Sequence, residues 1–333
     1  MNIVKTKSYN SDMRLKTIKE KTVTPQFLKK ISYSLFFLTI LIIVKSLILD
    51  IYVVPSRSME TAIQANDIII VNKAAYGINI PNSLNQIGVL NGLFNLHDIN
   101  ILPFSNVWFK SDPRRNEIVL FYSPEKAKNN LLVKRCIGLP GEVVYIKNDS
   151  VFINSVVQND LGTYKFDYVK KTDFWGIKER TKSKDLRSKG GGQNYVRHFY
   201  ISVTEQENLN KKGYRMIRFQ HNTTFPPVFP SFKQGEWNYQ NYGPIKIPKK
   251  NEQIILTESV YSIYKDVIKQ FEGKEVTRSI SGVYYMDGKA IKTYKFKNDY
   301  YFLLGDNRLN AIDSRYFGFI PRILIKGRVE FIK

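Results

Sequence analysis

The sequence predicts a mainly β domain that follows one N-terminal membrane-spanning helix. Two observations indicate this fold class. A single apolar run near the N-terminus is long enough to cross a bilayer, and the remaining chain alternates short β-rich runs with Gly, Pro, Asn and Asp. The chain has 333 residues and 43% hydrophobic content, so it can bury a substantial core.

The apolar run covers residues 31–49, ISYSLFFLTILIIVKSLIL. A helix of this length extends about 29 Å at ~1.5 Å per residue, which is close to the hydrocarbon thickness of a bilayer. Lys45 lies near its end, where the long side chain can reach the interface, and Asp50 marks the expected exit. Because no small-x-small cleavage pattern precedes Asp50, we expect an uncleaved anchor; a cleaved secretory signal and a buried core helix are the alternatives.

Residues 1–30 are basic and end where the apolar run begins. They carry eight Lys and Arg residues against Asp12 and Glu20. Lys and Arg residues next to a membrane span are retained on the cytoplasmic side. We therefore expect the N-terminus inside and everything after Asp50 outside, on the periplasmic side of the cytoplasmic membrane. We interpret the formal net charge of +22 through this contact with the lipid bilayer, because the sequence shows no aromatic or helix-turn-helix surface for nucleic acid.

The chain beyond the apolar run divides into β-rich parts and a different, basic part. Strand-like runs are DIIIV, NEIVLFY, EVVYI, SVFIN, QIILT, GVYYM and DYYFLLG. One helical pattern, SVYSIYKDVIKQFEG, ends at Gly273 as a helix C-terminus does. Residues 79–112 are expected to be a long connection, and residues 155–250, with the run KERTKSKDLRSKGGGQ, an inserted basic and aromatic region. We therefore expect residues 50–154 to form the first part of a catalytic core. Residues 251–333 are expected to contain the end of the inserted cap and the last part of the core.

The residues that commonly bind metals are scarce. Cys136 is the only cysteine, which excludes an internal disulfide and a CxxC metal site. His97, His198 and His221 are far apart in sequence and lie in no HExxH pattern. The sequence therefore predicts no metal site and no cofactor.

Three separated segments carry the candidate chemistry. They are PSRSMETAIQANDIIIVNKAAYG at 55–77, LLVKRCIGLPGEVVYI at 131–146 and GDNRLNAIDSRYFGFIP at 305–321. Each alone could be an ordinary turn or strand. Together, in this order and directly after the apolar run, they resemble the conserved boxes of bacterial type I signal peptidases, a family of membrane-bound serine proteases with a Ser-Lys dyad. The run GPIKIPKKNEQIIL is similar to Bacteroidota-type members.

The resemblance implies a function and a set of partners. The fold would be a signal-peptidase-like β ectodomain with a catalytic core and an inserted cap. The activity would be that of an endopeptidase that removes signal peptides from exported preproteins, cutting after a small residue that has another small residue two positions earlier. The partners would be signal peptides of secreted preproteins, the lipid bilayer and the secretion translocon, with no cofactor and no nucleic acid.

The chemistry of the pair Ser58 and Lys134 is coherent on physical grounds. A serine hydroxyl becomes a good nucleophile when a base removes its proton, and without a suitable histidine a neutral lysine can do this. The apolar residues 131–133 could desolvate the Lys134 amine and so lower its pKa. By resemblance, Ser58 is the nucleophile, Lys134 the general base, and the Ser58 N–H with the Ser56 hydroxyl the oxyanion hole.

The resemblance also assigns residues around this pair. It implies two ion pairs that hold the strands and the turn in place, namely Arg135 with Asp306 and Asp313 with Arg315. It places five apolar residues on the walls of shallow pockets for small substrate side chains: Val54, Met59, Ile63, Leu132 and Val133.

Two positions depart from the family pattern. Thr61 stands where the family usually has proline, and Ala311 stands where it usually has a serine that hydrogen-bonds the lysine. The second departure leaves an alternative open, that of a weak or inactive membrane-anchored relative that binds or scaffolds. A self-cleaving Ser-Lys repressor shares the dyad, but it would need a DNA-binding domain where this chain has an apolar run.

Overall fold

The structure is a computed structural model that describes residues 25–79, 107–108, 111–125, 130–170, 198–219, 228–233 and 236–333. It consists of two units, residues 1–44 and 45–333, and each is described by itself. Several predicted features lie outside the described residues: most of the basic segment, most of the connection at 79–112, the run KERTKSKDLRSKGGGQ, His97 and His221.

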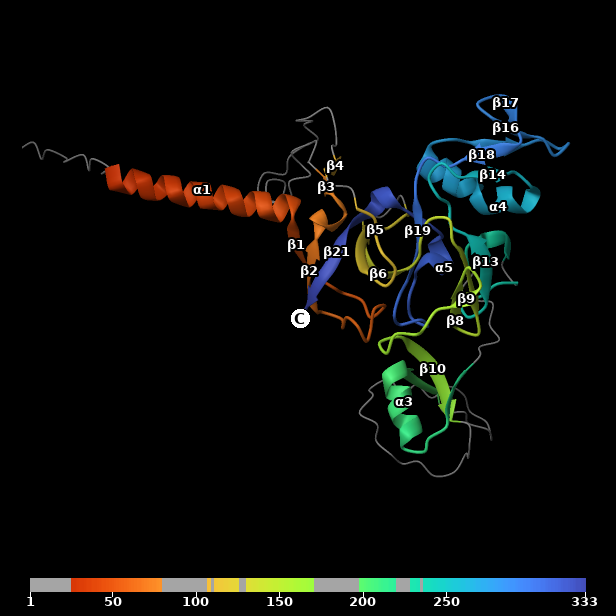
Figure 1. Ribbon diagram of the computed structural model, residues 1–333, viewed down its shortest axis with the longest axis horizontal. Coiled ribbons are helices and arrows are strands. Elements are labelled where there is room, and N and C mark those ends of the chain that lie inside the picture. Colours follow the sequence, from red (N-terminus) through yellow and green to blue (C-terminus); the bar gives the residue numbers. More distant parts are fainter. Residues whose placement is uncertain are drawn as a thin grey trace, which may run out of the picture. The chain divides into compact units, whose positions relative to one another are not determined.

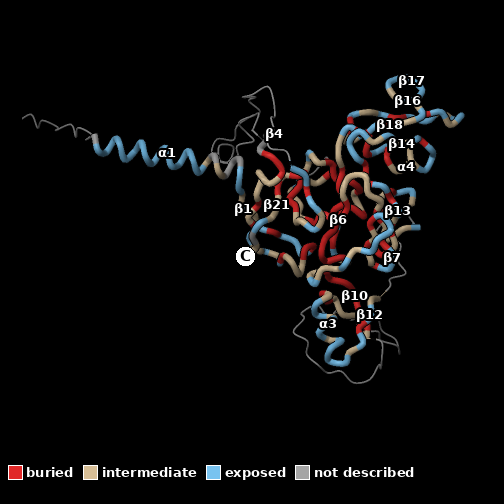
Figure 2. Tube along the Cα trace, in the orientation of Figure 1, coloured by how far each residue is buried: buried red, intermediate tan, exposed pale blue. Residues whose placement is uncertain are grey.

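Helix α1 (Pro25–Leu47) forms where the apolar run was predicted. All side chains from residue 26 to 41 are exposed, so this part of the helix has no buried stripe (Figure 2). The helix begins at Pro25 and ends at Leu47, and Leu49 begins strand β1, whereas the predicted spanning segment is 31–49. No helix within the described ranges combines the length and the hydropathy of a membrane span, and the predicted spanning segment is not confirmed.

The largest sheet of the second unit, called the central sheet below, has seven strands (Figure 1). Its order is β1-β2-β21-β5-β6-β19-β20, and all neighbouring strands are antiparallel. The bounds are β1 (Leu49–Val53), β2 (Ile68–Asn72), β5 (Ile118–Tyr122), β6 (Leu131–Gly138), β19 (Tyr300–Leu304), β20 (Ile320–Pro321) and β21 (Ile325–Ile332). The beginning, the middle and the end of the chain therefore meet in one sheet.

Smaller sheets surround the central one. The sheet β13-β7-β8-β9 consists of β7 (Val143–Lys147), β8 (Ser150–Ile153), β9 (Val156–Val157) and β13 (Tyr242–Lys246). The other small sheets consist of β3 (Ile78–Asn79) with β4 (Val107–Trp108), β14 (Gln253–Ile255) with β18 (Thr293–Lys295), and β15 (Val276–Arg278) with β16 (Tyr284–Met286) and β17 (Lys289–Ile291). Each strand-like run predicted from sequence contains a strand, so the mainly β fold is confirmed.

The described part of the predicted inserted region forms one separate sheet and also adds a strand to the four-stranded sheet. Strands β10 (Lys165–Lys170), β11 (His198–Ser202) and β12 (Met216–Arg218) form a separate sheet in the order β11-β10-β12, with helix α3 (Val203–Lys211) after β11. Near the other end of the region, β13 pairs with β7 of the four-stranded sheet. The division of the ectodomain into core and cap stays a prediction.

The predicted helix near residue 260 is present. Helix α4 (Glu258–Val267) begins after Thr257, whose side chain accepts a hydrogen bond from the backbone N–H of Val260. A π-helical turn, η4 (Ile268–Glu272), continues it to Gly273. Gly273 has a φ of 65°, a left-handed conformation that glycine adopts without strain, so the predicted C-terminus is confirmed.

The central sheet is packed on both faces. Along β5, Val119 and Phe121 belong to one buried cluster, whereas Leu120 belongs to another. This alternation follows from the two-residue period of a strand. The short helix α5 (Ser314–Phe317) follows β19, and the turn between β1 and β2 joins the second cluster through Met59. Both segments are thereby held against the sheet at the candidate site.

Candidate active site

Ser58 lies in the turn between β1 and β2. Ser58 is nearly buried, since only 9% of its surface is exposed to solvent. The backbone carbonyl of Ser58 accepts a hydrogen bond from the Asn307 N–H at 3.1 Å, and the Asn307 side-chain amide donates to the carbonyl of Arg57 at 3.1 Å. The C-terminal segment therefore holds the turn from one side. Asn307 belongs to the predicted motif, but no role was predicted for it, because backbone contacts leave no pattern in the sequence.

Lys134 lies on β6 and reaches the serine. The Lys134 Nζ atom lies 2.7 Å from Ser58 Oγ and donates a second hydrogen bond to the carbonyl of Val133 at 2.9 Å. The lysine is 3% exposed. The structure thus joins two side chains that are 76 residues apart in sequence.

Burial changes the acid-base character of this lysine. Desolvation lowers the pKa of Lys134 from 10.5 to about 8, although Asp313 and Asp306 raise it in part. On the sheet, Lys134 lies directly opposite Val119, which is fully buried. An amine with this pKa is partly neutral near physiological pH, so it can accept the proton of the adjacent hydroxyl.

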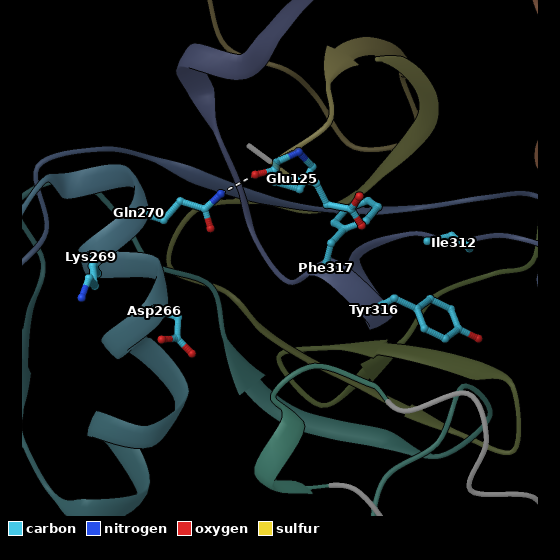
Figure 3. Close-up of a pocket in the computed structure, with 8 residues that line it drawn as sticks. Glu125, Asp266, Lys269, Gln270, Ile312, Tyr316 and Phe317 are labelled. Carbon is cyan, nitrogen blue, oxygen red and sulfur yellow. Dashed lines mark hydrogen bonds between the residues drawn. The ribbon is translucent and has the colours of Figure 1, made fainter. Parts of the chain in front are cut away.

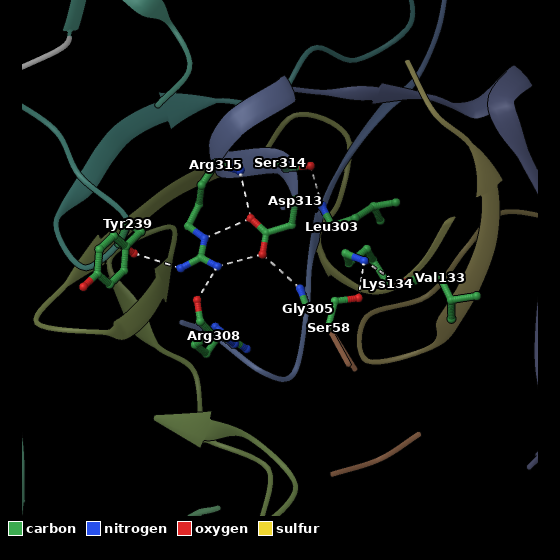
Figure 4. A network of polar contacts seen from close by, with 10 residues as sticks. All are labelled: Ser58, Val133, Lys134, Tyr239, Leu303, Gly305, Arg308, Asp313, Ser314 and Arg315. Carbon is green, nitrogen blue, oxygen red and sulfur yellow. Dashed lines mark hydrogen bonds and ion pairs between the residues drawn. The ribbon is translucent and has the colours of Figure 1, made fainter. Parts of the chain in front are cut away.

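Figure 4 shows a buried network beside the pair, centred on Asp313 and Arg315. Arg315 forms two hydrogen bonds to the Asp313 carboxylate, at 2.9 and 2.8 Å, and both residues are almost completely buried. The guanidinium also donates to the carbonyls of Tyr239 and Arg308, and the Gly305 N–H donates to Asp313. The ion pair therefore ties α5 to the strand end next to Lys134.

The second expected ion pair is also present. Arg135 forms two hydrogen bonds to Asp306, at 2.8 and 2.5 Å, and a third to the carbonyl of Asn116 at 2.7 Å. Arg135 follows Lys134 on β6, and successive side chains of a strand point to opposite faces. The pair therefore joins β6 to the segment after β19 without lying in the site itself.

Ser56 lies close to Ser58. The two hydroxyl oxygens are 3.3 Å apart, and Ser56 is exposed whereas Ser58 is nearly buried. Among the described residues, no group accepts a hydrogen bond from the Ser58 N–H. Both expected oxyanion donors thus lie next to the Ser58 hydroxyl.

A cavity of about 460 Å³ opens beside the pair, between the end of β1 and the start of β6. Val54, Leu132 and Val133 line it, together with Ser56 and Lys134. The other two expected pocket residues, Met59 and Ile63, are fully buried in the core and do not line it. The sequence could not separate these two groups, because all five side chains are apolar.

A larger cavity, of about 560 Å³, lies elsewhere in the second unit (Figure 3). It lies between α4, α5 and the end of β5, and Asp266, Gln270, Ile312 and Phe317 are among its lining residues. Neither the serine nor the lysine lines it. The smaller cavity is lined by Lys134 and Ser56, so it is the candidate substrate site.

Ala311 packs beside the reactive pair. A methyl group placed on Gly305 would lie 2.3 Å from Ala311 Cβ, 2.6 Å from Ser58 O and 3.6 Å from Lys134 Cδ. Glycine is therefore required at position 305, and the Ala311 methyl lies near the lysine side chain. In the place of the serine expected at 311, the carbonyl of Val133 is the second hydrogen-bond partner of the amine.

Cys136 and His198 are not bonded to this pair. Cys136 is buried in the core, and burial raises the pKa of its thiol. His198 bonds to Asp167 at 2.8 Å within the sheet of the inserted region. In the part of the chain that the structure describes, no group of three or more His, Cys, Asp or Glu side chains could bind a metal.

Comparison with known proteins gives consistent matches. The family model for "Signal peptidase, peptidase S26" matches residues 28–214 and 246–333. Signal peptidase I of Buchnera aphidicola subsp. Baizongia pistaciae is 26% identical over 312 residues, which cover 90% of this chain and 75% of the relative. That of B. aphidicola subsp. Schizaphis graminum is 25% identical over 338 residues, which cover 99% of this chain and 82% of the relative. That of Helicobacter pylori is 24% identical over 300 residues, which cover 89% of this chain and 78% of the relative.

The buried lysine generates a prediction about stability. Replacing Lys134 by methionine should increase the free energy of unfolding by up to about 3 kcal/mol near pH 7, because the wild type buries an ammonium whose pKa is depressed. The penalty is full below the folded pKa of about 8 and disappears as pH rises to the ordinary value of 10.5, so the gain should shrink over that range. Denaturant unfolding of both proteins at several pH values measures it.

The exposed Lys147 provides a matched control, because Lys147→Met removes the same group at the surface of β7. This control should show no such pH-dependent gain. Equal stability of Lys134→Met and wild type at every pH would show that the lysine carries no burial penalty.

Proposed function

The chain belongs to the signal peptidase family, peptidase S26, and on this premise we propose that it is a serine endopeptidase that removes signal peptides from exported preproteins. Ser58 acts as the nucleophile and Lys134 as the general base. One observation supports this assignment above the others: a nearly buried serine lies 2.7 Å from a buried lysine whose pKa is lowered to about 8. Lys134 also lines a cavity of about 460 Å³, which we propose as the place where the substrate binds.

The proposed reaction follows from this geometry. The neutral Lys134 amine takes the proton of the Ser58 hydroxyl, and Ser58 Oγ attacks the scissile carbonyl carbon. The oxygen that gains the negative charge accepts hydrogen bonds from the Ser58 N–H and the Ser56 hydroxyl. The Lys134 ammonium then gives its proton to the leaving amine, which releases the mature protein. Water, deprotonated by the same lysine, hydrolyses the acyl-enzyme and releases the signal peptide.

The free edge of β6 supports a binding mode for the substrate. β19 pairs with β6 only from Arg135 to Gly138, so at residues 131–134 the only described strand that pairs with β6 is β5. An extended signal peptide can add a strand to this edge, and alternate side chains can then enter the cavity next to Val54. Main-chain pairing would bind many sequences, whereas the cavity would select small residues near the cut.

The location proposed for the enzyme rests on its N-terminal segment. We place the protein in the cytoplasmic membrane, with the basic residues inside and the catalytic domain outside, near the translocon that delivers its substrates. The apolar run and the exposure of side chains 26–41 on every side of α1 support contact with lipid.

Removing either member of the pair should abolish processing. We expect Ser58→Ala and Lys134→Ala each to lower the rate by about 10³-fold or more, and the double variant to be no worse, because the two groups act as a unit. The measurement is cleavage of a preprotein by detergent-solubilised protein, with the new N-terminus sequenced. Circular dichroism provides the folding control, and substantial turnover in either variant would contradict the assignment.

The rate should depend on pH through the lysine. Since only the neutral amine can accept a proton, kcat/KM should rise with pH and level off above about 8, the pKa of Lys134 in the folded protein. A pH series on one preprotein measures this. The proposed mechanism uses no metal, so the same assay with a chelator should give an unchanged rate. A rate that falls with rising pH between about 6 and 8 would exclude Lys134 as the base.

Ala311→Ser should restore the hydroxyl that the family pattern expects. One neutral hydrogen bond to Lys134 contributes about 0.5–1.5 kcal/mol, so the rate should rise about two- to tenfold if the bond acts fully in the transition state. Ala311→Cys is a near-isosteric control with a poor hydrogen-bonding group. An unchanged rate would mean that the Val133 carbonyl already orients the amine sufficiently. An inert wild type with an active Ala311→Ser variant would favour the alternative, an inactive binding or scaffold protein.

The topology can be tested separately from the activity. In spheroplasts, added protease should digest the domain that follows α1 and leave an N-terminal tag intact. The same protein tagged at its C-terminus instead is the matched control, and its tag should be lost. Cleavage of the N-terminal tag under the same conditions would reverse the orientation.

A further inference from the structure

The turn that carries Ser58 also contacts a strand of the predicted inserted region. Glu60 Oε2 lies 3.3 Å from Lys165 Nζ, and the two side chains are only 16% and 9% exposed. Lys165 is the first residue of β10, the central strand of the sheet β11-β10-β12. A largely buried ion pair therefore joins the nucleophile turn to a sheet that none of the sequence motifs includes.

Thr61 provides a second link to the same segment. Its hydroxyl donates to the carbonyl of Thr163 at 3.0 Å, and its backbone N–H points to the same oxygen at 3.5 Å. The proline that the family pattern usually has at this position has neither an N–H nor a hydroxyl. The departure at Thr61 thus adds contacts that the usual residue cannot make.

The segment before β10 is also bonded to the C-terminal segment that holds the turn from the other side. The Lys165 N–H donates to the carbonyl of Asp306 at 2.8 Å, and the Arg308 N–H donates to the carbonyl of Lys165 at 3.0 Å. The Thr163 hydroxyl donates to the Asp306 carboxylate at 3.2 Å. The turn with Ser58 therefore lies between two segments that are bonded to each other.

We propose that the ion pair between Lys165 and Glu60 positions the nucleophile: it holds the turn so that the Ser58 hydroxyl stays within reach of Lys134. The two residues are positioning residues, since neither contacts the reacting atoms. β10 would then be part of the catalytic unit rather than of a separate cap. A displacement of about 1 Å in a reacting group can lower a rate about 10²-fold, so a small movement of the turn is sufficient.

The experiment compares Lys165→Met with a matched variant of the same sheet. Arg218 lies on β12, and Arg218→Met breaks its ion pair with Asp160; these two side chains are 21% and 20% exposed. In full-length protein assayed on one preprotein, Lys165→Met should lower kcat about ten- to hundredfold and change KM less than about twofold, because the substrate cavity is untouched. Arg218→Met should keep kcat within about twofold of wild type, and Lys165→Arg, which retains the charge, should recover most of the loss.

A second measurement does not require activity. Amide hydrogen exchange, read by mass spectrometry on the peptide that contains residues 57–61, should be faster in Lys165→Met and in Glu60→Gln than in wild type or Arg218→Met. The effect of the double variant should be smaller than the sum of the two single effects, because both substitutions remove the same ion pair; Glu60→Gln also alters the contact with the Asn307 amide at 3.5 Å.

The two measurements separate this proposal from the proposed function, on which it rests for its effect on rate. A wild type that does not cleave preproteins refutes the function, whereas the exchange comparison still decides whether the pair holds the turn. Normal exchange at residues 57–61 in Lys165→Met overturns the positioning role, whatever the turnover. Equal loss of kcat in Lys165→Met and Arg218→Met overturns it as well, since the effect would then be general to the sheet.

Discussion

The short contact between Lys134 and Ser58 requires an amine that is buried and yet close to its partner hydroxyl. Burial lowers the pKa of the lysine to about 8, but two nearby carboxylates, Asp306 and Asp313, favour the charged form. Each of these carboxylates forms a buried, bidentate ion pair with an arginine. Their negative charge is balanced locally, and the desolvation of the amine remains the larger effect. The ion pairs thus have an electrostatic consequence for the lysine in addition to their structural one.

The same contact restricts the backbone around it. Ser58 can approach β6 only because residue 305 has no side chain, since a methyl group there would lie 2.6 Å from the Ser58 carbonyl oxygen. Asn307 then bonds that carbonyl directly. The serine is therefore held mainly through its backbone, and its hydroxyl is left to interact with Lys134 and with the exposed hydroxyl of Ser56.

The sheet explains how one site can be both buried and open to a peptide. Toward Gly138, β6 is covered by β19, which helps to enclose the base. Toward Leu131 the same strand has an uncovered edge within the described structure, next to the cavity. The point where β19 ends its pairing thus separates the enclosed Lys134 from the uncovered edge of β6. In the proposed mechanism, chemistry and recognition would use adjacent parts of one strand.

Local sequence was sufficient to predict the strands β2, β5, β7, β8, β14, β16 and β19, the helix that ends at Gly273, and the pairing of Ser58 with Lys134 through the family pattern. These features depend on residue periodicity, on glycine at a left-handed position and on short motifs. The apolar residues 131–133 were expected to desolvate the lysine, but neighbours on a strand alternate between faces. Val119, directly opposite on β5, lies on the same face as the lysine and is fully buried.

Tertiary structure alone decided which apolar residues reach the substrate cavity. Met59 and Ile63 entered the core, whereas Val54 lines the cavity. It also brought Lys165 to Glu60 across 105 residues of sequence. The physical reason is the same in each case. Strand register and the packing of distant segments determine whether a side chain lies in the core or at the cavity. Neither is encoded in the residues adjacent to it in the chain.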